Sequence, residues 1–484
     1  MKQYILLIGF ALININILNA QWELVESKTT TELLSELGLP PLVVQYDIDS
    51  YRIEYPTTNI DGTAGMASGL LTIPKSTDFQ FPLLILQHGT VGSRDDVPSE
   101  LEGGYELGQI FGTLGFAVIQ PDYLGLGINP GIHPYVHADS EAWVALDLME
   151  HVLENYETNA PDRYLNDQIF ISGYSQGGHA GMAIHRLLEL EYQDEYTVTA
   201  ASHMSGPYSI SESMIDFTLG DEEYGFSAYL VSTSLSMKAA YPDLLQDFEI
   251  EDFFKPQFVD DIYAYANEDI DLWELNTALE TKLMSEFGAI IPNNLIFPEI
   301  VDALRNDPNH PLSMALALND VYDWAPEAPT RLLYCTADDQ VTFENAILAE
   351  EVMNVNGAAD VISQEQGADL DHGGCVSPAV TTTLFFFLGF RQLPTSTDEI
   401  FDKALTQMSA SQLENTLQVK IDPSVLNLKN PQFVLTDLNG KRLIGSQIQN
   451  DIFEVDLRNT SSGLYIMTLS SEGRVFESGK VFIR

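Results

Sequence analysis

The sequence is short of positive charge. Its 484 residues contain 22 Lys and Arg against 71 Asp and Glu, a formal net charge of −49. So few cations could not neutralise a nucleic acid backbone, and anionic lipid headgroups would repel such a surface. We therefore expect neither as a partner. The acidity favours solubility in surroundings where salt screens self-repulsion, and the alternative is cation binding by an acidic cluster.

Cysteine is equally scarce, with Cys335 and Cys375 alone in the chain. Two cysteines without neighbouring ligands argue against a zinc site, and we expect no metal. In an exported protein the default for such a pair is a disulfide. It would close a loop of about 40 residues and contribute about 4 kcal/mol by the chain-entropy model.

Long apolar runs are missing beyond the amino terminus. Lys2 precedes an apolar stretch from Tyr4 to about Leu18, and Ala20 offers a small residue for cleavage before Gln21. This pattern predicts a signal peptide over 1–20. Because no later run of about 18 apolar residues follows, we predict no stable membrane span and a secreted or cell-surface protein.

The length allows two or three domains, and charge marks a boundary between them. Residues 412–484 hold 8 Lys and Arg and 8 Asp and Glu, so 14 bases and 63 acids remain in the rest of the chain. We predict a catalytic domain over 21–392, a linker over 393–411 and a β-sandwich-like domain over 412–484. Short alternating strands and the hairpin signal Asn439-Gly440 support the last of these.

In 21–389, short apolar runs alternate with helical stretches, which predicts an α/β fold with a doubly wound, mostly parallel sheet. The alternation stops from about 209 to 328, and we predict an inserted helical cap there. Between Asp247 and Glu280 the cap carries 11 acids and one base, interleaved with aromatic residues. Those aromatics would either line a substrate pocket or form the core of the cap. The expected strands are 83–86, 117–119, 168–171 and 331–334, and the expected helices are 101–115, 140–156, 177–190 and 343–354.

The strongest chemical signal is Gly173-Tyr174-Ser175-Gln176-Gly177, which follows an expected strand and opens an expected helix. In that context the pentad predicts a nucleophile elbow, in which a tight turn holds the Ser175 hydroxyl at the sheet edge. The helix dipole there favours a developing anion. The less interesting alternative is a glycine-rich turn with an idle serine.

A serine nucleophile needs a base, and in this kind of site the order along the chain is serine, acid, histidine. Asp338 and Asp339 follow a late apolar strand, and among the nine histidines His372 alone lies beyond them. We predict Asp338 as the acid, with Asp339 as the alternative. Asp371 is expected to face solvent.

An oxyanion is stabilised by two backbone N–H donors. We expect one from Gln176 and the other from Thr90, with Val91 as the alternative to Thr90. Cys335 stands three residues before the predicted acid and Cys375 three after the predicted base. A disulfide between them would hold the acid and base loops together.

The first domain resembles the α/β-hydrolase superfamily, and more narrowly its secretory lipase and esterase branch. The resemblance covers most of 21–389 and implies hydrolysis of a small-molecule or lipid ester through an acyl-enzyme, without metal or organic cofactor. The rivals are a serine exopeptidase on the same fold and a non-catalytic surface binding protein. The shared elements are Gln87-His88-Gly89-Thr90, Pro121 to Gly127, His133-Pro134-Tyr135 and Gly173 to Gly178.

The tail resembles a type IX secretion sorting domain. This resemblance implies recognition by the type IX secretion machinery, export across two membranes and cleavage of the tail at the surface. A small carbohydrate-binding β domain is the alternative. The matching segments are Asp437 to Lys441, Gly463 to Ile466 and Lys480 to Arg484.

Overall fold

The structure is a computed structural model that divides into two compact units near residue 392. The predicted signal peptide, most of the predicted linker and the Asn439-Gly440 turn lie outside its described residues. The described residues are 21–38, 44–394, 409–413, 416–421, 426, 430–437, 441–458, 460–471 and 474–483.

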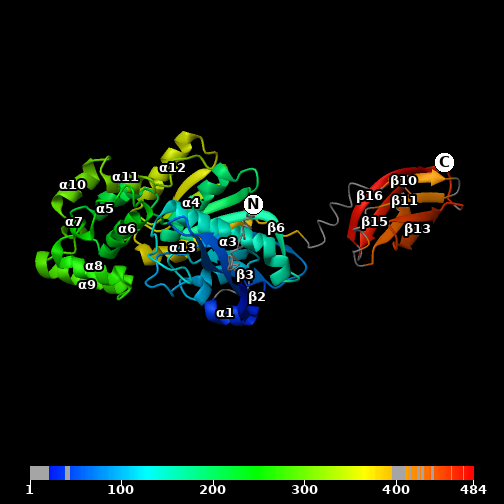
Figure 1. The fold of residues 1–484 in the computed structure, drawn as a ribbon. Helices are drawn as coiled ribbons and strands as arrows, with labels where there is room; N and C mark the ends of the chain where they lie inside the picture. Colours follow the sequence, from blue (N-terminus) through cyan, green and yellow to red (C-terminus); the bar gives the residue numbers. More distant parts are fainter. Residues whose placement is uncertain are drawn as a thin grey trace, which may run out of the picture. The chain divides into compact units, whose positions relative to one another are not determined.

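The first unit is built on a nine-stranded sheet in the order β1-β2-β3-β5-β4-β6-β7-β8-β9 (Figure 1). Strands β6 to β9 pair in parallel, as do β4 and β5, whereas β1, β2, β3 and β5 pair antiparallel. The mostly parallel sheet predicted from the sequence is thereby confirmed. Its strands are β1 (Gln21–Lys28), β2 (Ile48–Thr58), β3 (Ala64–Pro74), β4 (Gln80–Gln87), β5 (Ala117–Pro121), β6 (Tyr164–Tyr174), β7 (Val198–Met204), β8 (Thr330–Tyr334) and β9 (Val361–Glu365).

Helices cover both faces of this sheet because its central strands are apolar on both sides. In β4, Leu83 and Ile85 belong to the apolar cluster with α3, α4 and α12, and Leu84 and Leu86 to the cluster with α2 and α13. Successive side chains of a strand point to opposite faces, so one apolar run builds two cores. The helices are α1 (Thr30–Leu37), α2 (Glu106–Thr113), α3 (Ala138–Asn159), α4 (Gln176–Glu191), α12 (Glu344–Asn356) and α13 (His372–Phe390), with a 3-10 turn η1 (Pro98–Glu100).

Helix α13 departs from the prediction that no apolar segment long enough to span a membrane follows the amino terminus. Among the described residues it is the one helix that is long and apolar enough to cross a membrane, by length and composition only. Cys375, Ala379 and Phe387 are buried in the sheet core. These contacts are those of a core helix of the sheet unit.

The predicted cap is helical and has its own core. Its helices gather beside the sheet (green in Figure 1), and α9 buries Leu275, Leu279 and Leu283, which recur every four residues as on one helix face. Among the described residues, no three His, Cys, Asp or Glu come together as a group that could hold a metal ion. The cap elements are η2 (Ile210–Met214), α5 (Ile215–Thr218), α6 (Ser227–Ala240), α7 (Ile250–Phe253), α8 (Pro256–Ala266), α9 (Leu272–Phe287), η3 (Pro292–Asn294), α10 (Pro298–Asn306) and α11 (Pro311–Ala317).

The second unit contains two antiparallel sheets, β10-β11-β14 and β13-β12-β15-β16. Leu417 and Val455 from the first sheet share one apolar core with Phe433 and Met467 from the second. Strand β10 starts at Ser409, inside the segment predicted as linker. Its sequence is mostly polar, so it shows no alternation of apolar and polar residues from which a strand could be predicted. The strands are β10 (Ser409–Leu413), β11 (Thr416–Lys420), β12 (Gln432–Thr436), β13 (Arg442–Gln447), β14 (Ile452–Asp456), β15 (Gly463–Ser471) and β16 (Arg474–Ile483).

Candidate active site

Ser175 lies in a strained turn between β6 and α4. Its φ of 62° and ψ of −125° put a non-glycine residue in a region that costs free energy and recurs at functional sites. The positions on either side of this turn have room only for glycine. A Cβ on Gly173 would lie 2.0 Å from the carbonyl oxygen of Gly177, and a Cβ on Gly177 would lie 2.2 Å from that of Gln87. The pentad therefore folds as the predicted elbow.

His372 and Asp338 form a buried hydrogen-bonded pair. His372 Nδ1 lies 2.7 Å from Asp338 Oδ2 and 2.9 Å from Oδ1. The same Oδ1 accepts the backbone N–H groups of Gln340 and Val341, at 3.0 and 2.9 Å. The Asp338 carboxylate is thus oriented by its own loop as well as by the imidazole. Its contact is with Nδ1, so Nε2 of His372 is available to another partner.

The two other carboxylates near His372 bind backbone instead of the ring. Asp339 accepts the N–H of His372 at 3.1 Å, and Asp371 caps α13 by accepting the N–H of Gly374 at 2.7 Å. Both side chains are exposed, as expected for Asp371. Asp338, the first of the two predicted acids, is therefore the one that the structure brings to the His372 ring.

Tyr174 connects the turn at Ser175 to His372. Its ring centroid lies 4.9 Å from that of His372, and its hydroxyl donates to the His372 carbonyl oxygen at 2.5 Å. Ser175 therefore follows directly on a residue that packs against the predicted base. Within the described residues Ser175 Oγ makes no hydrogen bond to His372. Such contacts are often long before substrate binds.

The loop after β4 lies against the elbow. A Cβ on Gly89 would come within 3.7 Å of Ser175 Cβ, which shows how closely this loop approaches. The backbone N–H groups of Gln176, Thr90 and Val91 have no acceptor within the part of the chain that the structure describes. The Thr90 hydroxyl is held by Tyr135, at 2.9 Å between the two oxygens. Both candidates for the second oxyanion donor thus remain open.

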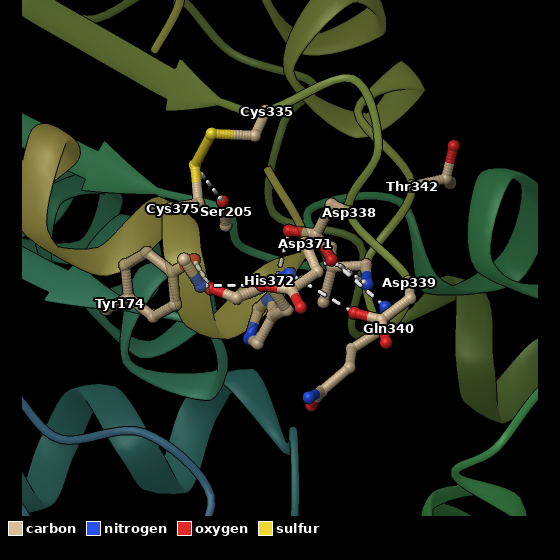
Figure 2. A network of polar contacts seen from close by, with 12 residues as sticks. Tyr174, Ser205, Cys335, Asp338, Asp339, Gln340, Thr342, Asp371, His372 and Cys375 are labelled. Carbon is tan, nitrogen blue, oxygen red and sulfur yellow. Dashed lines mark hydrogen bonds and ion pairs between the residues drawn. A yellow bond between two sulfur atoms is a disulfide. The ribbon is translucent and has the colours of Figure 1, made fainter. Parts of the chain in front are cut away.

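A disulfide joins Cys335 to Cys375. Cys335 follows β8 and precedes the Asp338 loop, whereas Cys375 lies in the first turn of α13, one helical turn from His372. Figure 2 shows the disulfide and the Asp338–His372 pair in the same network. The bond therefore links the two segments that carry the hydrogen-bonded pair.

An apolar pocket opens at Ser175. None of its lining residues carries a charge, and most belong to the cap, including Ile210, Leu230 and Leu304. The aromatics at 253, 254 and 258 are buried in the cap core instead. Of the two roles considered for the cap aromatics, these three residues therefore form part of the core of the cap. The pocket's own aromatic lining is Tyr135, Tyr224 and Tyr229.

A second pocket adjoins the first and is more polar. Gln176 and Tyr135 line both, and Thr90 lines the second. Its charged residues include Arg94, whose guanidinium donates to the carbonyl oxygen of Gly125 at 2.8 Å and also binds Glu268. The site thus has an apolar and a polar side, which meet beside the elbow.

The sequence reasoning missed the side-chain contacts beneath the elbow. Gln176 Nε2 lies 2.8 Å from His133 Nε2 and 2.8 Å from Glu141 Oε1. Burial lowers the pKa of His133 to about 4, so its ring is neutral and accepts from Gln176. One signal in the sequence could have indicated these contacts. Glu141 stands among the alanines of α3, and an acid on an apolar helix face needs a buried partner.

No protein-family model matches the chain, and no curated protein matches its sequence. Solved structures do resemble it. A presumed hydrolase from Legionella pneumophila aligns with a TM-score of 0.68 at 24% identity, over 76% of this chain and 97% of that one. The rice cell wall degrading esterase LipA from Xanthomonas oryzae gives 0.62 at 24% identity, over 75% and 94%.

Candida antarctica lipase A in its closed state is more distant, with a TM-score of 0.54 at 16% identity over 76% of this chain and 81% of that one. At such identities a likeness establishes the fold and leaves the chemistry to the site. The first unit of this chain therefore has the α/β-hydrolase fold, shared with esterases and lipases.

Proposed function

We propose that this protein is a serine hydrolase that cleaves carboxylic esters through an acyl-enzyme intermediate. The observation that carries the proposal is the buried Asp338–His372 pair beside the strained Ser175 elbow. His372 would take the proton of Ser175, whose hydroxyl attacks the ester carbonyl. Asp338 would hold the imidazole tautomer and stabilise the imidazolium. His372 would then protonate the leaving alcohol, and water would release the acid.

The unbonded N–H groups of Gln176 and Thr90 support an oxyanion hole at this place. Donors that are already oriented and lack other acceptors cost little reorganisation when the oxyanion forms. Val91 is the alternative to Thr90. The uncharged, mostly apolar lining of the pocket favours an apolar acyl group, because burying a hydrocarbon chain there replaces water at apolar surface.

Hydrolysis of p-nitrophenyl esters from acetate to palmitate tests the proposal. We expect the wild type to prefer chains longer than acetate, and Ser175→Ala to abolish turnover while it leaves the thermal unfolding temperature close to that of wild type. Equal activity of Ser175→Ala would refute the serine mechanism. A folded wild type that cleaves no ester but removes terminal residues from peptides would indicate the exopeptidase alternative. A lack of both activities would indicate a binding protein.

We also propose that residues 1–20 direct export and that 412–484 serve the type IX secretion machinery, so that the enzyme acts outside the cell. The support is the sequence pattern of both segments, together with the separate compact core of the second unit. The charge difference between the two modules supports the same division.

A further inference from the structure

A buried carboxylate lies directly beneath the proposed oxyanion hole. Glu141, in the first turn of α3, is 1% exposed, and its Oε1 accepts from the side chain of Gln176 at 2.8 Å. A negative charge so close to Gln176, whose backbone N–H would stabilise an oxyanion, should oppose catalysis unless it is compensated.

His179 provides that compensation. It lies in the first turn of α4, is fully buried, and its Nδ1 stands 2.6 Å from Glu141 Oε2. Its Nε2 lies 2.9 Å from the carbonyl oxygen of Asn319, which can only accept. The Nε2 atom must therefore carry a proton, and a second proton must lie between Nδ1 and Glu141. Whichever of the two atoms holds that proton, the pair as a whole is neutral.

Asn319 holds the pair in place, since its side chain accepts the N–H of Ala138 at 2.8 Å and donates to the Ala315 carbonyl oxygen at 2.8 Å. The pair is thus fixed between α3, α4 and the end of α11.

We propose that His179 and Glu141 are positioning residues of the oxyanion hole: Glu141 fixes Gln176, and His179 neutralises the charge that this contact brings to the site. The inference rests on the proposed function, because it concerns the charge that forms on the ester oxygen during attack by Ser175. Neither residue touches the reacting atoms. Their influence passes through Gln176 and through the local field.

Substitutions with the same shape separate charge from structure. In Glu141→Gln the new amide can accept from Gln176 and donate to His179 Nδ1, so every contact is kept without a charge. In His179→Asn the new amide nitrogen can still donate to Glu141, but the carboxylate is left uncompensated. We expect kcat to fall about tenfold or more in His179→Asn and clearly less in Glu141→Gln, with KM changing little in both.

The double variant distinguishes an effect of charge from a purely structural effect. We expect His179→Asn with Glu141→Gln to recover most of the kcat that His179→Asn loses, because the uncompensated charge is gone. A purely structural role predicts instead that the double variant is at least as impaired as His179→Asn, and this result would overturn the proposal. Fluorophosphonate titration of active serines and thermal unfolding establish the folded fraction of each variant, so that kcat refers to folded enzyme.

Failure of this inference is distinguishable from failure of the proposed function. If wild type hydrolyses esters and Ser175→Ala does not, the function stands whatever the double variant does. If wild type cleaves no ester, the same four proteins can be compared by their rate of phosphonylation at Ser175, which also places negative charge on an oxygen at this site. An equal rate in His179→Asn and wild type would then overturn the inference.

Discussion

At the scale of single residues, the orientation of Asp338 follows from its own loop. One of its oxygens accepts two backbone N–H groups of the turn that follows, and both oxygens lie within 2.9 Å of His372 Nδ1. Hydrogen bonds from fixed backbone donors favour a carboxylate in one orientation. The loop therefore holds the Asp338 carboxylate in one orientation beside His372.

The neighbouring carboxylate gives a matched control for this assignment. Asp338→Asn would place an amide beside Nδ1 and favour the wrong imidazole tautomer, so we expect kcat to fall by about 10³- to 10⁴-fold. Asp339→Asn keeps an oxygen that can accept the His372 N–H, and we expect a change of less than about threefold. Steady-state kinetics on one ester checks both. A large loss in Asp339→Asn together with a small one in Asp338→Asn would reverse the assignment.

The sequence could predict Ser175 and His372 because each depends on local pattern and chain order. It predicted Asp338 with Asp339 as the alternative, since both follow the same strand and the fold of the turn decides which one meets the ring. Glu141 and His179 were out of reach for a different reason. They lie 38 residues apart on separate helices, and only the packing of those helices brings them beneath Gln176.

At the scale of elements, the sheet edge gathers the site from four segments: the loops after β4 and β8 and the starts of α4 and α13. The disulfide ties the loop after β8 to α13, so the segments that carry Asp338 and His372 are covalently linked. The alternation of apolar runs and helical stretches predicted β4, β5, β6 and β8, but it missed β7, which lies between β6 and β8, and β9. The pattern did not identify β1 to β3 as an antiparallel extension.

A buried histidine pair joins β7 to α4 and gives the fold a pH dependence. His203 is fully buried, its Nε2 lies 3.3 Å from His185 Nδ1, and His185 in turn contacts Glu189 at 3.0 Å. Burial, with His185 adding to it, lowers the pKa of His203 well below 6.5. The folded state therefore binds fewer protons than the unfolded chain, and stability is lost as the pH falls below about 6.5.

Replacing His203 should weaken this acid sensitivity. His203→Gln keeps a donor for His185 but does not titrate. Between pH 6.5 and 5 we expect the free energy of unfolding of wild type to fall more steeply than that of the variant, by up to about 1.4 kcal/mol per pH unit. Denaturant unfolding across this pH range measures the difference. Parallel curves would show that His203 is protonated as easily in the folded protein as in the unfolded one.

At the scale of the whole molecule, the cap and the sheet domain together line the apolar pocket at Ser175, and the second unit has a core of its own. The sequence predicted a helical cap, but its apolar pattern could not tell pocket residues from core residues. Ile210, Leu230, Phe253 and Phe258 all belong to the apolar cluster of the cap, but only Ile210 and Leu230 of these four line the pocket. That division depends on how the cap helices pack together.

Removal of the second unit should separate catalysis from export. Every residue that we place in the site lies before residue 393, so a chain that ends at Gln392 should keep kcat and KM for an ester within about twofold. In cells, the same truncation should leave the enzyme inside the envelope, if 412–484 carry the export signal. Kinetics of the purified proteins and fractionation of expressing cells measure the two effects. Normal export of the truncated chain would remove the sorting role from the tail.

The central claim is that Ser175 is a nucleophile activated by His372, and labelling with a fluorophosphonate tests it most directly. The account predicts one adduct per folded molecule, located by peptide mass spectrometry on Ser175, with labelling abolished in Ser175→Ala and slowed at least about a hundredfold in His372→Ala. Absence of an adduct on the folded wild type, or an adduct on another residue, would contradict the account.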